Sequence, residues 1–519
     1  MHWADKLTKE IIDSKKYLPY WVDDMKTPSG FAHVGSLRGP LIHSVMFRAL
    51  RDAGQEAKFT FVFNDFDPAD EFPPEFKDEL SIHAGKALKE VPSPDPKFEN
   101  LADLLADDLK TVMKNLGCEA EFLSSWEMYK AGKFDGVIKL ALDHAEEIQE
   151  IYQRVSGSAK KEKGWLPFQA ICANCGKLGT TRVYAWDGKE VSYICEPDMV
   201  SWAKGCGHEG KVSPFGGTGK LPWKVDWSAH WKVVGVTIEG AGKDHASKGG
   251  SYDIAMEICE KVFGYAKPFK IPYEFFLIGG KKMSSSKGLG NKAHDITKML
   301  PAEIARFLFT RTRYQEQIDF DPVETMAIPD LFDEYDRCWD CFVSGADENL
   351  SRAFEFAQVS SVPKKEKIFL PRFRDVVNYL QNAEKDLVKK FAEVKGSELT
   401  KDEKDILEER LEYAKVWLDN YAPEDFKVVM KDEAPKVNLD GEQKKFLSDA
   451  IALVEKDLDE ESLQKELYEL AKSSGVDIKK AFSSIYMVFI GKDFGPRAGA
   501  FLLSYPKEKV IERLKESSK

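Results

Sequence analysis

The stretch from residue 20 to residue 52 most constrains how this chain can fold. An apolar run ends in the carboxylates Asp23 and Asp24, a turn rich in Gly and Pro follows at 27–39, and apolar residues then recur every four positions. This pattern predicts a strand, a turn and an amphipathic helix. Such a junction directs backbone N–H groups and the positive end of a helix outward, so it can hold a phosphate. An ordinary strand-to-helix turn with a surface histidine, His33, would carry the same pattern.

A second apolar run, at 57–63, leads directly into two more carboxylates, Asp65 and Asp67. It predicts a buried strand whose carboxyl end carries acidic side chains. Doubly wound parallel sheets bind ligands at the carboxyl ends of their strands, so Asp65 is a candidate ligand contact. Turn formation or helix capping is the alternative role for an Asp in this position.

Four cysteines between residues 172 and 206 have the spacing of a metal site. Cys172 and Cys175 are separated by two residues, Cys195 follows after nineteen more, and Cys206 after another ten. Thiolates in this arrangement favour a structural Zn²⁺ in tetrahedral coordination. His208 could replace Cys206 as the fourth ligand, and buried free thiols are the simpler alternative.

The bulk composition excludes some classes of protein. The chain has 519 residues and a formal net charge of −12, so it is not a uniformly basic nucleic-acid binder. A local basic stripe would still be enough to bind RNA. No apolar run approaches the ~18 residues of a membrane helix, and the N-terminus lacks a signal-peptide pattern. We therefore expect a cytoplasmic protein that does not bind membranes.

A lysine- and serine-rich stretch at 281–290 follows the apolar run 275–280. Its lysines and hydroxyls suit a triphosphate, because charge develops on the phosphate oxygens as pyrophosphate leaves. A solvated surface turn would have the same composition.

Taken in order, the two polar stretches resemble the signatures of class I aminoacyl-tRNA synthetases. Residues 27–36 are similar to the His-Ile-Gly-His motif, and residues 282–286 to the Lys-Met-Ser-Lys-Ser motif. Ser36 stands in place of the second His and Ser285 in place of the second Lys. Lys287 could supply the charge that Ser285 lacks.

The resemblance narrows further along the chain. Residues 242–245 and 249–253, with Trp223 and Trp227 upstream, are similar to class I lysyl-tRNA synthetases, and so are residues 489–499. The resemblance implies ATP-dependent activation of L-lysine to lysyl-adenylate and transfer to the 3′ end of tRNA(Lys), with Mg²⁺ accompanying ATP. We take a monomer as the working expectation.

The resemblance also assigns roles to residues. The catalytic residues are expected to be His33, Lys282, Ser284 and Lys287. ATP is expected to contact Ser29, Gly30, His33, Gly35, Ser36, Lys282, Met283, Ser284 and Ser285. The lysine pocket is expected to comprise Gly30, Trp223 and His245, with Asp244 nearby. Its ammonium group needs a carboxylate partner, for which Asp65 is our candidate and Asp67, Glu239 and Asp244 are the alternatives. Zn²⁺ is expected at Cys172, Cys175, Cys195 and Cys206.

The predicted fold is a Rossmann-like doubly wound parallel sheet with a zinc-binding insertion, followed by an all-α anticodon-binding domain. The strand signal disappears beyond residue 290, and helical periodicity takes over. The predicted segments are 1–160 and 221–295 for the two halves of the catalytic domain, 161–220 for the insertion, 296–350 for a stem-contact region, and 351–519 for the helical domain. Within that last segment, residues 364–374 interleave cations with aromatic side chains, which suits unstacked RNA bases or, equally, a packed loop.

Two rival functions keep many of these features. A class I synthetase specific for glutamate or arginine would retain every catalytic motif. A non-catalytic tRNA-binding paralogue would retain the helical domain and the cysteines, but it would have no need of His33 or Lys282.

Overall fold

The computed structural model describes residues 1–519 except 158–163, 283–291, 382–385, 425 and 429. The chain forms two compact units, one comprising residues 1–321 and 337–366, the other residues 322–336 and 367–519. The five-segment division expected from the sequence is finer than this and stays a prediction.

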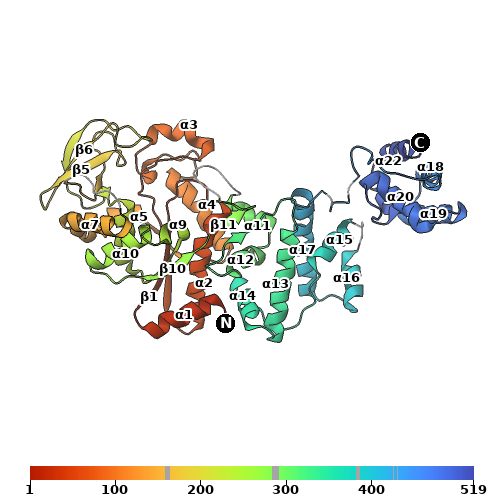
Figure 1. Ribbon diagram of the computed structural model, residues 1–519, viewed down its shortest axis with the longest axis horizontal. Helices are drawn as coiled ribbons and strands as arrows, with labels where there is room; N and C mark the ends of the chain where they lie inside the picture. The colour runs from red at the N-terminus through yellow and green to blue at the C-terminus, as the bar shows by residue number, and fades with distance from the viewer. Residues whose placement is uncertain (158–163, 283–291, 382–385, 425, 429) are drawn as a thin grey trace. The chain divides into compact units, whose positions relative to one another are not determined.

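The first unit is built on a five-stranded parallel sheet with the order β10-β9-β1-β2-β3 (Figure 1). Its strands are β1 (Tyr20–Lys26), β2 (Ala57–Phe63), β3 (Glu121–Ser124), β9 (Ile238–Gly242) and β10 (Phe269–Tyr273). The strand order runs outward from β1 in both directions, so the topology switches between β1 and β9. Ligands bind at such switch points in open α/β sheets. The predicted Rossmann-like parallel sheet is confirmed.

Helices cover the sheet because both of its faces are apolar. The last five residues of β2 are all buried, as expected for a parallel strand covered on both sides. Helix α2 (Arg38–Asp52) packs against β1, β2 and β9, while α8 (Trp223–His230) packs against α10 (Ser251–Lys261). The other main helices of this unit are α1 (Trp3–Ser14), α4 (Leu101–Asn115), α5 (Ser125–Lys130), α6 (Asp135–Asp143), α7 (Ala145–Ser156), α9 (Lys243–Ala246), α12 (Ala302–Thr310) and α14 (Glu348–Ala357).

The cysteine-bearing segment forms its own small sheet between α7 and α8. Strands β5 (Thr181–Trp186), β6 (Val191–Cys195) and β7 (Glu209–Val212) pair antiparallel, and they are drawn in yellow and yellow-green in Figure 1. Two short strands, β4 (Gln169–Ala170) and β8 (Gly219–Lys220), pair with each other where the insertion leaves and rejoins the main fold. This pairing carries the end of the insertion, Lys220, back to the large sheet.

The second unit is helical throughout its described residues. Its helices are α15 (Phe373–Gln381), α16 (Leu387–Lys395), α17 (Lys401–Asn420), α18 (Gly441–Glu455), α19 (Glu460–Ser473), α20 (Ile478–Ile490), α21 (Ala498–Leu503) and α22 (Lys507–Ser517), with the first part of α13 (Ala327–Ser344). Capping boxes at Thr400 and Asp440 fix the starts of α17 and α18. The predicted helical C-terminal domain is confirmed. No helix in the described ranges is long and apolar enough to cross a membrane.

Part of the mixed basic and aromatic segment at 364–374 is packed within this unit. Arg372 contacts the carboxylate of Asp333 at 2.7 Å, and the Phe373 ring stacks on Phe332 with centroids 4.0 Å apart. Arg374 also pairs with Asp333. These contacts fit the packed-loop interpretation of this stretch, since the guanidinium groups already have carboxylate partners.

Candidate active site

A cleft of about 740 Å³ lies at the carboxyl ends of β1 and β9, where the strand order switches. It is lined by residues that are up to 258 positions apart in the sequence, from Asp24 to Lys282. Of the predicted site residues, the structure brings these to the cleft: Ser29, Gly35, Ser36, Trp223, Asp244, His245 and Lys282. Gly30 and His33 belong to the same turn but do not line the cleft itself.

His33 is held as a neutral hydrogen-bond donor. It precedes a short 3₁₀ turn, Val34–Leu37, and its Nδ1 accepts the backbone N–H of Ser36 at 3.2 Å. The proton of the neutral ring therefore sits on Nε2. Burial, together with the positive charges of Lys26 and Lys282, lowers the pKa of His33 to about 4. At neutral pH the ring can donate from Nε2 to an anion.

Lys282 approaches the cleft from a β-hairpin. Strand β12 (Lys281–Lys282) pairs with β11 (Phe276–Ile278), and Lys282 Nζ lies 2.8 Å from Asp244 Oδ2. Burial acts to raise the pKa of Asp244, but the hydrogen bond from Lys282 outweighs it and the pKa is lowered. The cation is therefore pre-positioned by a carboxylate at the cleft. The other predicted residues of this motif, Met283, Ser284, Ser285 and Lys287, lie outside the described residues.

Asp65 does not reach the cleft. Its carboxylate accepts the Ser124 hydroxyl at 2.5 Å and the Trp126 backbone N–H at 2.8 Å, at the start of α5. Lys89 Nζ lies 3.9 Å away. These contacts fit the capping alternative, and the geometry gives no support to Asp65 as the partner of a substrate ammonium.

A different carboxylate, Asp24 on β1, faces the cleft. The Met25 backbone N–H donates to Asp24 Oδ1 at 2.9 Å, and the other carboxylate oxygen of Asp24, Oδ2, points toward α2. A Cβ atom added to Gly39 would lie 2.7 Å from Asp24 Oδ2 and 2.7 Å from the Tyr273 hydroxyl. A side chain at position 39 would therefore displace the carboxylate. The sequence marks Asp24 only as a carboxylate at the end of an apolar run, and the glycine at the start of the amphipathic helix that follows, Gly39, was the one further signal.

A buried histidine supports this corner. His43 is fully buried; its Nε2 accepts the Gly240 N–H at 2.6 Å and its Nδ1 lies 2.8 Å from the Gly39 carbonyl oxygen. With Nε2 as acceptor, Nδ1 carries a proton, and it also lies 3.4 Å from Asp24 Oδ2. Burial acts to lower the pKa of His43, but the negative charge of Asp24 raises it overall. His43 therefore orients the backbone around Asp24 and also contacts its carboxylate.

Glu239 on β9 lies beside this corner and is 1% exposed. Its carboxyl group accepts the indole N–H of Trp227 at 2.9 Å and also that of Trp231. Burial raises the pKa of Glu239 to about 8. The group therefore holds a proton at neutral pH and loses it in mild alkali.

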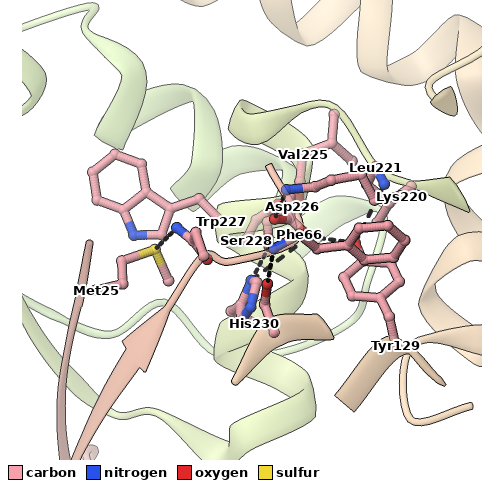
Figure 2. A network of polar contacts seen from close by, with 12 residues as sticks. Met25, Phe66, Tyr129, Lys220, Leu221, Val225, Asp226, Trp227, Ser228 and His230 are labelled. Carbon is pink, nitrogen blue, oxygen red and sulfur yellow. Dashed lines mark hydrogen bonds and ion pairs between the residues drawn. The ribbon is translucent and has the colours of Figure 1, made fainter. Parts of the chain in front are cut away.

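A second pair of carboxylates at the cleft, Asp67 and Asp226, has a lysine of the chain as its partner (Figure 2). Lys220 is 1% exposed and pairs with Asp67 and with Asp226, the latter at 2.9 Å. Figure 2 shows Tyr129 and His230 converging on Asp226; the tyrosine hydroxyl donates to its carboxylate. Burial acts to lower the pKa of Lys220, but the two carboxylates outweigh it and the pKa is raised.

This network of hydrogen bonds and ion pairs extends to the turn at residues 27–39. The Thr27 hydroxyl donates to Asp67 Oδ2 at 2.5 Å, so Lys220, at the end of the insertion, is linked through Asp67 to the turn that carries His33. Both Asp67 and Asp226 line the cleft.

An aromatic wall completes the cleft. The rings of Trp223 and Trp227 stack with centroids 6.1 Å apart, and His245 packs edge-on against both, at 5.5 and 5.8 Å. Such a wall can cover an alkyl chain and attract a cation through its ring faces.

The four predicted cysteines come together in the insertion. Their sulfur atoms all lie within 4.8 Å of one another, with Cys172–Cys206 at 3.6 Å and Cys175–Cys195 at 3.7 Å. Zn–S bonds of about 2.3 Å in a tetrahedron place sulfur atoms about 3.8 Å apart, so the group fits this ion. No disulfide joins any of the four cysteines, and His208 is not part of the group.

Known protein families match almost the whole chain. The model for class I tRNA synthetases (K) matches residues 1–361, and the model for an anticodon binding domain matches residues 369–517. A lysine–tRNA ligase from Archaeoglobus fulgidus is 32% identical over 519 residues, covering 99% of both chains. A lysine–tRNA ligase from Methanocaldococcus jannaschii is 34% identical over 539 residues, again covering 99% of both.

Proposed function

The chain belongs to the class I lysyl-tRNA synthetase family, and on that premise we propose that it is a lysine–tRNA ligase. It activates L-lysine with ATP to give lysyl-adenylate and pyrophosphate, then transfers the lysyl group to the 3′ end of tRNA(Lys) and releases AMP. The observation that carries the proposal is the cleft at the β1/β9 switch point, where the turn of Ser29 and Ser36 meets Lys282.

ATP would bind across the turn and the hairpin, with Mg²⁺ as its counterion. Residues Ser29, Gly30, Gly35 and Ser36 would hold the nucleotide close to the backbone, and neutral His33 would donate from Nε2 to the phosphates. Lys282 is already directed at the cleft by Asp244. It would stabilise the charge that develops on the departing pyrophosphate. The family resemblance assigns the same task to Met283, Ser284, Ser285 and Lys287.

We place the lysine side chain between the aromatic wall and Asp24. Trp223 and His245 would cover its alkyl stem, and Asp24 would pair with its ammonium group. A charged group in a closed pocket needs an opposing carboxylate, because an unpaired buried charge costs several kcal/mol. Asp24 takes the role expected of Asp65, since Asp24 lines the cleft and Asp65 does not.

The remaining parts of the chain would serve the RNA and the fold. The helical unit would bind the anticodon of tRNA(Lys), as the matched family model suggests. Cys172, Cys175, Cys195 and Cys206 would hold Zn²⁺, which would contribute folding free energy to the insertion. Metal analysis of a Cys172→Ser variant tests this; an undiminished zinc content would contradict it. We place the activity in the cytoplasm.

Amino-acid-dependent ATP–pyrophosphate exchange is the decisive test. Lysine should support exchange, whereas glutamate and arginine should not. His33→Ala should slow lysine-dependent exchange by about 10²- to 10³-fold, the usual cost of losing one donor to the transition state. His144→Ala is a matched control, because His144 is exposed at the start of α7 and is not among the cleft residues. Exchange with glutamate or arginine alone, or none with any amino acid, would overturn the proposal.

A further inference from the structure

The last residue of β1, Lys26, lies at the point where the strand order switches, and it lines the catalytic cleft. It stands opposite Phe63 at the end of β2, and its carbonyl oxygen accepts the Asn64 backbone N–H at 3.0 Å. The backbone of Lys26 is therefore fixed to the neighbouring strand, directly before the turn at residues 27–39. None of the contacts proposed for lysine or ATP involves this side chain.

Lys26 is a cation to which the chain gives no anionic partner. Two lysines line the cleft, and the other one, Lys282, is held by Asp244 at 2.8 Å. Lys26 is half-buried, and it forms no ion pair with any carboxylate among the described residues. Burial lowers the pKa of Lys26, and the charge of Asp24, on the same face of β1, acts against this without outweighing it. An ammonium group in this position is stabilised when a ligand brings an anion to it.

Lys26 also belongs to a group of three donors around the turn at residues 27–39. Together with burial, the charges of Lys26 and Lys282 lower the pKa of His33 to about 4, so both ammonium groups lie near enough to act on the histidine ring. The proton of the neutral ring is on Nε2. A phosphate has several charged oxygen atoms that can accept from all three donors at once, and lysine is a common phosphate ligand. The group therefore fits a phosphate.

We propose that Lys26 is a further catalytic residue, whose ammonium group contacts the α-phosphate of ATP, the phosphate that lysine attacks. The inference rests on the proposed function. One carboxylate oxygen of lysine forms a bond to the α-phosphorus, while the bond from that phosphorus to the oxygen that bridges to the β-phosphate breaks. Pyrophosphate leaves with the electron pair of the broken bond, and Lys26 neither gains nor loses a proton.

The position of Lys26 on β1 selects the attacked phosphate rather than the leaving one. Lys26 is two residues from Asp24, the proposed partner of the substrate ammonium, so it lies on the side of the cleft where lysine would bind. Lys282 comes instead from the hairpin of β11 and β12 and is suited to the departing pyrophosphate. A fixed cation beside the α-phosphate stabilises the charge that its oxygen atoms carry in the transition state.

Lys26→Met tests the inference, because it removes the charge and keeps the length of the side chain. It should lower kcat for lysine-dependent ATP–pyrophosphate exchange by about 10²-fold, as for the loss of one contact to transition-state charge. KM for lysine should change by less than about threefold, because the lysine contacts are intact. Lys26→Gln should show the same loss, whereas Lys26→Arg keeps the charge and should retain at least about a tenth of the rate. Exchange kinetics with varied lysine and ATP, and single-turnover formation of lysyl-adenylate, measure these effects.

Lys58→Met is the matched control. Lys58 is exposed near the amino end of β2, with Nζ 4.3 Å from the centre of the Trp21 ring, and it is not among the cleft residues. Its exchange rate should stay within about twofold of that of the unchanged protein. The melting temperature of Lys26→Met should not fall, because no ion pair is lost.

The inference is overturned if Lys26→Met leaves kcat unchanged. It is also overturned if the melting temperature falls and Lys26→Arg slows exchange as much as Lys26→Met does, since Lys26 would then be structural. A rise of about tenfold in KM for lysine at unchanged kcat would assign Lys26 to the lysine carboxylate and overturn the inference as well. Failure of exchange in the unchanged protein would refute the proposed function itself, so the two failures are distinguishable.

Discussion

Two acidic groups lie against the catalytic cleft, and they differ in the source of their positive charge. Asp67 and Asp226 are paired with Lys220, a buried cation of the chain itself. Within the described residues Asp24 and Glu239 form no ion pair with a lysine or arginine, and the one basic side chain paired with Asp24 there is that of His43, at 3.4 Å. Lys26 is near enough for Asp24 to act on it, but burial dominates and lowers the pKa of Lys26.

The difference separates a structural charge pair from a binding charge. A carboxylate that already pairs with a buried cation gains little from a second cation. Here Asp67 and Asp226, through Lys220, connect the insertion, the turn at residues 27–39 and α8. A carboxylate at the cleft without such a partner is available to a cation that arrives with the substrate. The chain thus neutralises Asp67 and Asp226 with its own Lys220, whereas in our proposal Asp24 pairs with the substrate lysine.

Lys220→Met should have the largest effect. It leaves two carboxylates without their cation in a buried site, which should lower the free energy of unfolding by about 3–5 kcal/mol. Chemical denaturation measures this directly. Adding Asp226→Asn should restore part of the loss, because one of the two unpaired charges is then removed. Unchanged stability would mean that Lys220 is not the neutralising group.

Asp24→Asn should raise KM for lysine by about two orders of magnitude, the scale of a lost buried charge pair. KM for ATP should stay within a few-fold. Steady-state exchange kinetics with varied lysine and varied ATP measure both. If ATP binding weakens while lysine binding does not, Asp24 belongs to the nucleotide or its Mg²⁺.

Asp65→Asn is the same chemical change at the end of the neighbouring strand, and it should have a smaller and different effect. It weakens the hydrogen bonds to Ser124 and Trp126, so the free energy of unfolding should fall by about 1–2 kcal/mol. KM for lysine should change by less than twofold. A hundredfold rise in that KM would restore Asp65 as the ammonium partner.

The smallest effect concerns pH. Glu239 has a pKa raised to about 8, so it is protonated at neutral pH and becomes negative above it. The added charge should attract the lysine ammonium, and KM for lysine should fall by about threefold between pH 7 and pH 9. Glu239→Gln should remove this trend. A KM that rises with pH would contradict the sign of the argument.

Several features followed from local sequence alone. The apolar run to Asp24, the turn with Gly30 and Gly35, and the four-residue periodicity after it predicted β1, the phosphate turn and α2. The cysteine spacing predicted which four sulfur atoms would meet. These are properties of one segment at a time: periodicity decides whether a run becomes strand or helix, and short spacings fix which thiols can share a corner.

The tertiary structure decided which carboxylate faces the cleft. Asp24 lies near the carboxyl end of β1 and Asp65 just beyond that of β2, and both follow apolar runs, so nothing in their local sequence ranks one above the other. The start of α5 turns Asp65 inward, whereas the absent side chain of Gly39 leaves space for Asp24. Lys220 likewise meets Asp67 only because the insertion returns to the sheet there. The direction and partners of a charged side chain depend on elements as far as 153 residues away, as for Lys220 and Asp67, and the sequence pattern around it carries no record of them.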